Sequence, residues 1–412
     1  MLTGTPSDRR LPHLRRRAGA ASRRLARRAL PVLLCLIAAC SRGAARVDDD
    51  IDRLMSAYRG SVPGASVMVL RDGAVIFRRA YGYADLEEHV AATPATNYRL
   101  ASMTKQFTAA AVMLLAQDGR LSLDDPLREW LPELPQAAAP MTLRQLLTHV
   151  SGLIDYEDLI PAGATQQVHD EDVLHLLAAE DRTYFPPGSQ YRYSDSGYAL
   201  LSLVVARASH QSFATFLRER IFQPLGMQDT VAYEQGVSMV TRRAFGYSVQ
   251  GAKWVRTDQS LTSAVLGDGG VYSSIDDLAR WDAALYDGRL LNAASRGQAF
   301  APSVATDDPN VRYGFGWRIT GESVWHSGET LGFRNVIVRF PSRHFTVIIL
   351  SNRNDPEPYG TALAIAKLYF ADADSVHATQ VVVGPDPGAR LLPDSGAGSE
   401  EKPDGVPPPG RH

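Results

Sequence analysis

The chain has 412 residues, of which 45% are hydrophobic and 21% are charged, and its formal net charge is −2. Its two cysteines, Cys35 and Cys40, lie in the first forty residues, which excludes disulfides and thiol chemistry from the remaining body. That body has about 320 residues and is long enough to be stabilised by its core alone. Without residues 1–39 the chain has 34 basic and 44 acidic residues, a formal charge of −10, which disfavours a nucleic-acid partner.

Residues 1–39 have the pattern of a secretory signal. Nine arginines precede the apolar run "ALPVLLCLIAAC", which is too short to span a bilayer. The run ends in "IAAC", which resembles the lipobox of bacterial lipoproteins. That resemblance implies cleavage before Cys40, acylation of its sulfur, and a lipid anchor on a bacterial membrane facing the periplasm or the cell exterior. An ordinary signal peptide, cut at a small residue nearby, is the alternative.

Composition suggests three further segments. Residues 40–50 read as a short polar tether, and residues 51–372 as one folded domain. The tail 375–412 is rich in Pro, Gly and charge and has no apolar periodicity, which is typical of a disordered segment.

Sheet-forming segments near both ends of the domain enclose a helical middle. Two apolar runs meet at Asp72–Gly73, a strong hairpin signal, and two more flank Pro341–Arg343. Hairpins imply an antiparallel sheet. Residues from about 121 to 265 read as a mainly helical insert, and Ser274 is the predicted N-cap of a later helix. We therefore predict an α+β fold, with an antiparallel sheet flanked by helices and a mainly helical subdomain.

The stretch "RLASMTKQFTAAAVMLLAQDGRL" contains the first candidate site. Apolar residues recur after Ser102 at helical spacing, and Gly119 is a predicted helix stop, so that Ser102 and Lys105 share one face of the first turns. A helix N-terminus suits a developing oxyanion, and an amine in a buried position can accept the proton of a serine. An arginine stays protonated in proteins and could not do so. Only four of the 43 basic residues are lysine, which makes the choice at position 105 notable.

The spacing Ser-x-x-Lys is weak evidence alone, because Ser399 and Lys402 in the tail repeat it. A second cluster, "YRYSDSGYALL", supports it with Tyr193 and Asp195 just before a helix that we expect to begin near Gly197. The alternative interpretation is a buried tyrosine followed by an ordinary helix cap.

A third cluster, "VWHSGETLGFRNVIV", contains His326 and Gly328 ahead of a pair of strands. A small, glycine-bearing strand edge can present backbone N–H groups to a ligand. The alternative is a plain turn into a strand.

In this order and at these separations, the three clusters resemble those of the serine β-lactamase and penicillin-binding protein superfamily. The stretches "LRQLLTHVSGL", "RIFQPLGMQDT", "GDGGVYSSIDDLARW" and "YGFGW" are similar to its class C β-lactamase-like group, which includes esterases and D-amino-acid peptidases. The resemblance spans residues 51–372 and implies a β-lactamase/DD-peptidase-like fold.

The resemblance also implies roles for individual residues. Ser102 would be the acylated nucleophile, Lys105 would accept its proton or balance charge, and Tyr193 would act as base and then as proton donor. The oxyanion would lie between the backbone N–H groups of Ser102 and Glu329. Substrate contacts would come from the tyrosine triplet and the strand element, namely Asp195, His326, Ser327, Gly328 and Glu329. No metal and no organic cofactor is implied.

Two positions depart from the family pattern. Many relatives have Asn where this chain has Asp195, and an ionised carboxylate there would stabilise the ammonium form of Lys105 and favour Tyr193 as the base; a protonated Asp195 could instead mimic Asn. His326 stands where β-lactamases and transpeptidases have Lys, and a histidine is mostly neutral at pH 7 because its reference pKa is ~6.5.

We therefore expect an exported serine hydrolase of the class C β-lactamase-like group that acts on a small-molecule or peptide substrate through an acyl-enzyme. Esterase or D-amino-acid peptidase activity fits better than β-lactamase or DD-carboxypeptidase activity. A non-catalytic cell-envelope binding protein of the same fold is the alternative from another class, and the oligomeric state stays open.

Overall fold

The computed structural model describes residues 46–370. The predicted signal peptide 1–39, the lipidation site Cys40 and the tail 375–412 lie outside the described residues. Residues 46–54 are helical, which corrects the prediction of a polar tether as far as residue 50. Val47 and Ile51 stand four residues apart and so share one face of this helix, a spacing that we overlooked among the aspartates.

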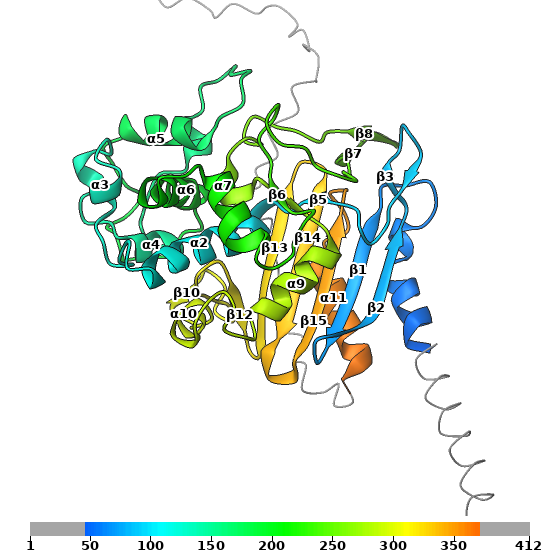
Figure 1. The fold of residues 1–412 in the computed structure, drawn as a ribbon. Coiled ribbons are helices and arrows are strands. Elements are labelled where there is room, and N and C mark those ends of the chain that lie inside the picture. Colours follow the sequence, from blue (N-terminus) through cyan, green and yellow to red (C-terminus); the bar gives the residue numbers. More distant parts are fainter. Residues whose placement is uncertain (1–45, 371–412) are drawn as a thin grey trace, which may run out of the picture. The chain divides into compact units, whose positions relative to one another are not determined.

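From Leu54 onward the fold is organised by one eight-stranded antiparallel sheet (Figure 1). Its strands, in spatial order, are β10 (Val304–Ala305), β11 (Arg312–Tyr313), β12 (Arg318–Thr320), β13 (Ser323–Thr330), β14 (Phe333–Phe340), β15 (Phe345–Ser351), β1 (Ala65–Arg71) and β2 (Ala74–Tyr81). Strands from both ends of the domain thus lie side by side at β15 and β1, which pair antiparallel.

Both predicted hairpins are confirmed. Asp72 and Gly73 connect β1 to β2 with φ angles of 52° and 75°, the left-handed values that a tight two-residue turn requires. The short 3₁₀ turn η6 (Pro341–Arg343) connects β14 to β15.

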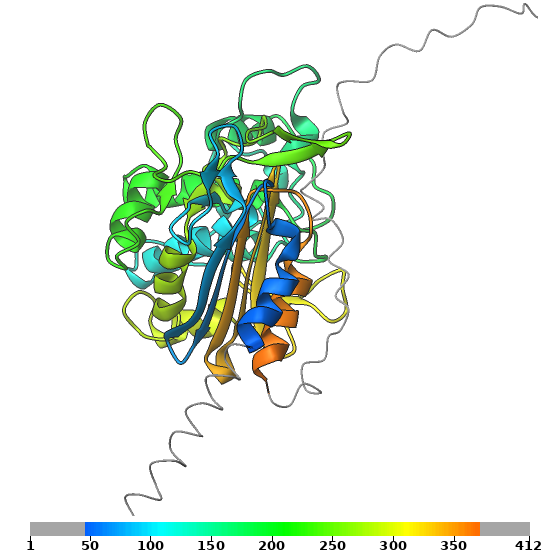
Figure 2. The same cartoon turned by 90° about the vertical axis from the view of Figure 1, so that its right-hand side faces the viewer.

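Helices cover both faces of the sheet (Figure 2). On one face lies α11 (Pro358–Tyr369), where Tyr359 stacks on Trp325 of β13 with ring centroids 4.1 Å apart. On the other lies α9 (Ile275–Ala284), where Asp282 forms a buried ion pair with Arg339 of β14 at 2.6 Å. Because successive strand residues point to opposite faces, Trp325 and the next residue, His326, belong to different sides of the sheet.

The remaining helices form a mainly helical region beside the sheet. They are α2 (Lys105–Gln117), α3 (Leu127–Trp130), α4 (Leu143–Leu147), α5 (Asp170–Ala178), α6 (Asp195–Ser209), α7 (Phe213–Leu217), the π-helical turn η5 (Arg218–Phe222), α8 (Leu266–Gly269) and α10 (Ala293–Ala299). Short 3₁₀ turns are η1 (Ser56–Tyr58), η2 (Ala101–Thr104), η3 (Gln136–Ala138) and η4 (Tyr156–Leu159). The α+β fold is as predicted, and Ser274 caps α9 by accepting the N–H of Asp277 at 3.2 Å.

The expected helical insert needs one correction, because residues 231–256 contain strands. The short strand β6 (Val231–Ala232) joins β9 (Val271–Ser273), which also pairs with β5 (Tyr98–Arg99). A separate hairpin is formed by β7 (Tyr247–Gln250) and β8 (Lys253–Arg256), and β3 (Tyr83–Asp85) pairs with β4 (Val90–Ala91). The hairpin turns at Gly251, whose φ of 62° favours glycine.

Within residues 46–370, the structure contains no helix that combines the length and the apolar character needed to cross a bilayer.

Candidate active site

Ser102 lies at the point where the chain leaves β5 and enters α2. It belongs to the 3₁₀ turn η2, and α2 begins at Lys105, so the serine precedes the α-helix by one turn instead of lying in its first turn as expected. Ala101, just before it, has a φ of 51°, a left-handed value that a residue with a side chain adopts only at a cost. The packing around η2 must therefore stabilise this backbone conformation, which in turn fixes the position of Ser102.

Gly328 allows the sheet to approach this turn closely. A Cβ added to Gly328 would lie 1.9 Å from the Leu100 carbonyl oxygen and 3.1 Å from the Met103 nitrogen. Only glycine fits such a contact between β13 and η2. The contact brings the next residue, Glu329, into the wall of the cavity that Ser102 also lines.

Lys105 is fully buried and surrounded by three acceptors. Its Nζ donates to Ser102 Oγ at 3.1 Å, to Asp195 Oδ1 at 2.5 Å and to the Asp268 carbonyl oxygen at 3.1 Å. An ammonium group has three N–H donors, whereas a neutral amine would have two. The arrangement therefore suits the charged form, in which Lys105 donates to the serine instead of accepting its proton.

The second cluster lies at the N-terminus of α6. The helix begins at Asp195, two residues earlier than expected, and Ser194 is its N-cap, with Oγ accepting the N–H of Gly197 at 3.2 Å. The capping interpretation of this cluster is therefore correct for Ser194. It does not exclude a role for the neighbours, because Asp195, the first residue of the helix, accepts a hydrogen bond from Lys105.

Tyr193 is 5% exposed, and the centroid of its ring lies 4.9 Å from Lys105 Nζ. On β12, the guanidinium carbon of Arg318 lies 5.2 Å from the same centroid. Two cations therefore lie close to the phenol ring, a placement that would stabilise a negative charge on its oxygen.

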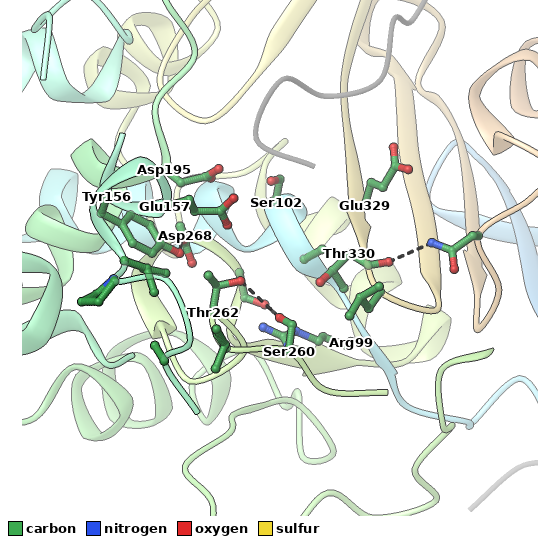
Figure 3. Close-up of a pocket in the computed structure, with 18 of the residues that line it drawn as sticks. Arg99, Ser102, Tyr156, Glu157, Asp195, Ser260, Thr262, Asp268, Glu329 and Thr330 are labelled. Atoms are coloured by element: carbon green, nitrogen blue, oxygen red, sulfur yellow. Dashed lines mark hydrogen bonds between the residues drawn. The ribbon is translucent and has the colours of Figure 1, made fainter. Parts of the chain in front are cut away.

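Beside Ser102 is a cavity of about 260 Å³ (Figure 3). Figure 3 shows the carboxyl groups of Glu157, Asp195 and Asp268 on one side of Ser102 and Glu329 on the other. The remaining lining residues are Arg99, Ala101, Tyr156, Ile160, Pro161, Ala162, Gly163, Ala164, Ser260, Leu261, Thr262, Gly269, Thr330, Leu331 and Asn354.

The acidic wall is less charged than its composition suggests. Burial, with the nearby charge of Asp195, raises the pKa of Glu157 to about 9. Burial likewise raises the pKa of Asp268 well above its usual value and that of Asp155 to about 6. At neutral pH, Glu157 is therefore a neutral hydrogen-bonding group. Sequence analysis missed both Glu157 and Asp268, since neither is close in sequence to Ser102; Asp268 lies in the quoted "GDGG" stretch, which could have drawn attention to it.

His326 is not where a substrate-contacting residue would lie. It is 1% exposed, and its Nε2 is 2.9 Å from the Tyr313 hydroxyl while its Nδ1 is 2.6 Å from the Ser327 carbonyl oxygen. Burial and the charge of Arg318 lower its pKa well below 6.5. The expectation of direct contact is therefore corrected: of the four strand residues singled out, Glu329 lines the cavity, whereas His326, Ser327 and Gly328 do not.

In the part of the chain that the structure describes, no group of three or more His, Cys, Asp or Glu side chains is arranged to hold a metal ion.

Comparisons with known proteins show what the whole chain is similar to. The family model described as Beta-lactamase matches residues 47–371. Over 317 residues the chain is 32% identical to a penicillin-binding protein of Bacillus subtilis (strain 168), a match that covers 72% of this chain and 70% of that protein.

Two solved structures are also similar. The octameric penicillin-binding protein homologue from Pyrococcus abyssi has a TM-score of 0.70 at 26% identity, over 79% of this chain and 77% of that one. The D-amino acid amidase from Ochrobactrum anthropi SV3, complexed with L-phenylalanine amide, has a TM-score of 0.67 at 26% identity, over 79% of this chain and 96% of that one.

Proposed function

The chain belongs to the β-lactamase family of serine hydrolases, and we propose that it hydrolyses esters or amides through an acyl-enzyme on Ser102. One observation carries the proposal: Ser102 Oγ lies 3.1 Å from Lys105 Nζ at the edge of a cavity of about 260 Å³. A serine hydroxyl becomes a useful nucleophile only when neighbouring groups activate it, and here the neighbours are Lys105 and, next to it, Tyr193.

The proposed reaction has two halves. Tyr193 begins as the phenolate. Ser102 Oγ attacks the substrate carbonyl carbon and its proton passes to the phenolate oxygen, while the carbonyl oxygen becomes an oxyanion that accepts hydrogen bonds from the backbone N–H groups of Ser102 and Glu329. The carbonyl reforms as the bond to the leaving group breaks, and Tyr193 returns the proton to that group. Water then attacks the ester and gives a proton to Tyr193, which passes it to Ser102 as the acid departs.

In this scheme Tyr193 is the base and Lys105 acts through its charge. The hydrogen bonds that Lys105 donates to Ser102, Asp195 and the Asp268 carbonyl support that assignment. Its ammonium group would stabilise the phenolate and orient the nucleophile without carrying the proton itself.

Within the class C β-lactamase-like group, we favour an esterase or D-amino-acid peptidase over a β-lactamase or DD-carboxypeptidase. The position that holds a permanent lysine charge in β-lactamases and transpeptidases is here His326, which is buried and whose pKa lies well below 6.5. A dedicated cation for a substrate carboxylate is thus missing at that position. The likeness to a D-amino acid amidase also supports an amide substrate.

A Ser102-dependent adduct would test the function. The purified body, from residue 41 onward, and its Ser102→Ala variant are incubated with a fluorophosphonate probe and with a fluorescent penicillin, and the intact mass is measured. Labelling of the wild type by fluorophosphonate alone supports the esterase-like activity, whereas stable labelling by penicillin indicates a penicillin-binding role. Absence of any Ser102-dependent adduct would refute the proposal and favour a non-catalytic binding protein.

We also propose that the protein is exported and anchored to a bacterial membrane through acylated Cys40, on the strength of the "IAAC" run after an arginine-rich leader. Cells grown with a clickable fatty acid should yield labelled protein in the membrane fraction. A Cys40→Ala variant should lose the label, and retention of the label would contradict the assignment.

A further inference from the structure

His149 occupies an unusual position next to Tyr193. It follows α4 and has a φ of 59°, the left-handed conformation, and its side chain is 1% exposed. The residue lies in the stretch "LRQLLTHVSGL", to which neither the nucleophile nor the oxyanion site assigns a role.

Two hydrogen bonds attach His149 to the residues on either side of Tyr193. The N–H of Arg192 donates to the His149 carbonyl oxygen at 3.0 Å, and the N–H of Ser194 donates to His149 Nδ1 at 3.1 Å. The residues before and after the tyrosine are thus both held by a single residue.

The imidazole also packs directly on the phenol. Its centroid lies 4.3 Å from that of Tyr193, with 31° between the planes. Tyr198 of α6 lies 5.1 Å away at 36°, and Tyr313 of β11 meets the ring edge-on at 4.6 Å. The ring is therefore enclosed, and it restricts how far the Tyr193 side chain can rotate.

The neutral form of His149 is required for this arrangement. Nδ1 accepts a hydrogen bond, so the ring proton resides on Nε2, which is buried without a hydrogen-bond partner among the described residues. Burial, with the charge of Lys105, lowers the pKa of His149 well below 6.5 and keeps the acceptor available. A buried donor left unsatisfied is costly, so the other contacts of the ring must offset that cost.

We propose that His149 is a positioning residue that holds the Tyr193 phenol in line with Ser102 and Lys105. The inference rests on the proposed function, since it assigns His149 a purpose only if Tyr193 transfers protons. A displacement of about 1 Å at a reacting group can cost up to about 100-fold in rate. The loss of one of the His149 contacts that hold Tyr193 should therefore be measurable.

Two variants separate the contacts of the imidazole. His149→Phe keeps an aromatic ring but removes the acceptor for the Ser194 N–H, whereas His149→Asn keeps an acceptor oxygen near Nδ1, tolerates the left-handed backbone and removes the ring. The rate constant of Ser102 acylation by the fluorophosphonate probe and the KI of the preceding non-covalent complex are determined separately. The acylation rate constant should fall roughly 10- to 100-fold in H149F and by less in H149N, with KI within about threefold of the wild-type value.

Thr142→Ala is the matched control, because the Thr142 side chain caps the same helix α4 by accepting the N–H of Gln145. It should lower Tm but leave the acylation rate constant unchanged. A wild-type rate constant in H149F, or in H149N if H149F does not fold, would overturn the inference, as would an equal loss in T142A. If the wild type itself shows no Ser102-dependent adduct, the proposed function is refuted. Normal acylation in both His149 variants would instead refute only the role of His149.

Discussion

Lys105 and Asp195 form a buried ion pair, with 2.5 Å between Nζ and Oδ1 and side chains that are 0% and 11% exposed. The pair joins the first turn of α2 to the first turn of α6, two helices whose sequences are ninety residues apart. It holds the candidate nucleophile and the tyrosine-bearing segment in one site, and its geometry suits the ammonium form of Lys105.

Removing Asp195 should destabilise the protein strongly. In Asp195→Ala, the Lys105 charge stays buried without its counter-ion, and loss of one partner of such a pair costs about 3–5 kcal/mol. Asp195→Asn, which keeps an acceptor, should lose less. The free energy of unfolding is measured by urea denaturation. Asp124→Ala, which breaks the exposed pair with Arg144, is the control and should cost less than about 1 kcal/mol; equal losses in D195A and D124A would contradict the interpretation.

Lys105→Arg should acylate far more slowly than the wild type even though the positive charge is kept. A guanidinium is planar and larger, so it cannot donate in the three directions that Ser102, Asp195 and the Asp268 carbonyl require. We expect a loss of roughly 10²- to 10³-fold in the rate of labelling by fluorophosphonate, the usual effect of losing a preorganised hydrogen-bond donor. Lys253→Arg, on exposed β8, should label normally. Normal labelling of K105R would refute the assigned role of the amine.

Gly328→Ala should disrupt the contact between β13 and η2. The added methyl group would lie 1.9 Å from the Leu100 carbonyl oxygen, so the strand or the turn must move. We expect a lower Tm and little Ser102-dependent labelling, because the same contact places Glu329 beside Ser102. Gly297→Ala in α10 has open space around the new Cβ and should raise stability by about 0.5–1 kcal/mol. Wild-type labelling and Tm in G328A would show that the contact is dispensable.

The free energy of unfolding should fall as the pH rises from 7 to 9, partly because of Glu157. Its pKa is about 9 in the folded protein and near 4.5 in the unfolded chain, so the folded state binds the proton more tightly. The stability that this proton binding contributes is lost as the pH rises from the unfolded pKa through the folded pKa. Glu157→Gln cannot ionise and should show a shallower decline between pH 7 and 9. The interval avoids Asp155, whose pKa is about 6. Identical slopes for the two proteins would contradict the assignment.

Local patterns in the sequence determined the elements and one half of the site. Three-residue spacing at a helix start is enough to bring Ser102 and Lys105 together, because residues three apart on a helical turn are neighbours regardless of the tertiary fold. The Asp72–Gly73 turn and the Ser274 cap follow from local chemistry in the same way. The family resemblance then drew attention to Tyr193 and Asp195, which spacing alone could not have connected with Ser102.

Tertiary structure decided what the local patterns left open. Which face of β13 carries Trp325 and which carries His326 depends on the pairing of β13 with β14 and on the position of α11, and these placed the histidine ring against Tyr313, outside the cavity wall. The same is true of the hydrogen bond between His149 and Ser194, next to Tyr193, and of the raised pKa of Glu157. Both require segments far apart in the chain to pack together. Burial and the direction of a side chain are properties of that packing, and short-range sequence patterns do not contain them.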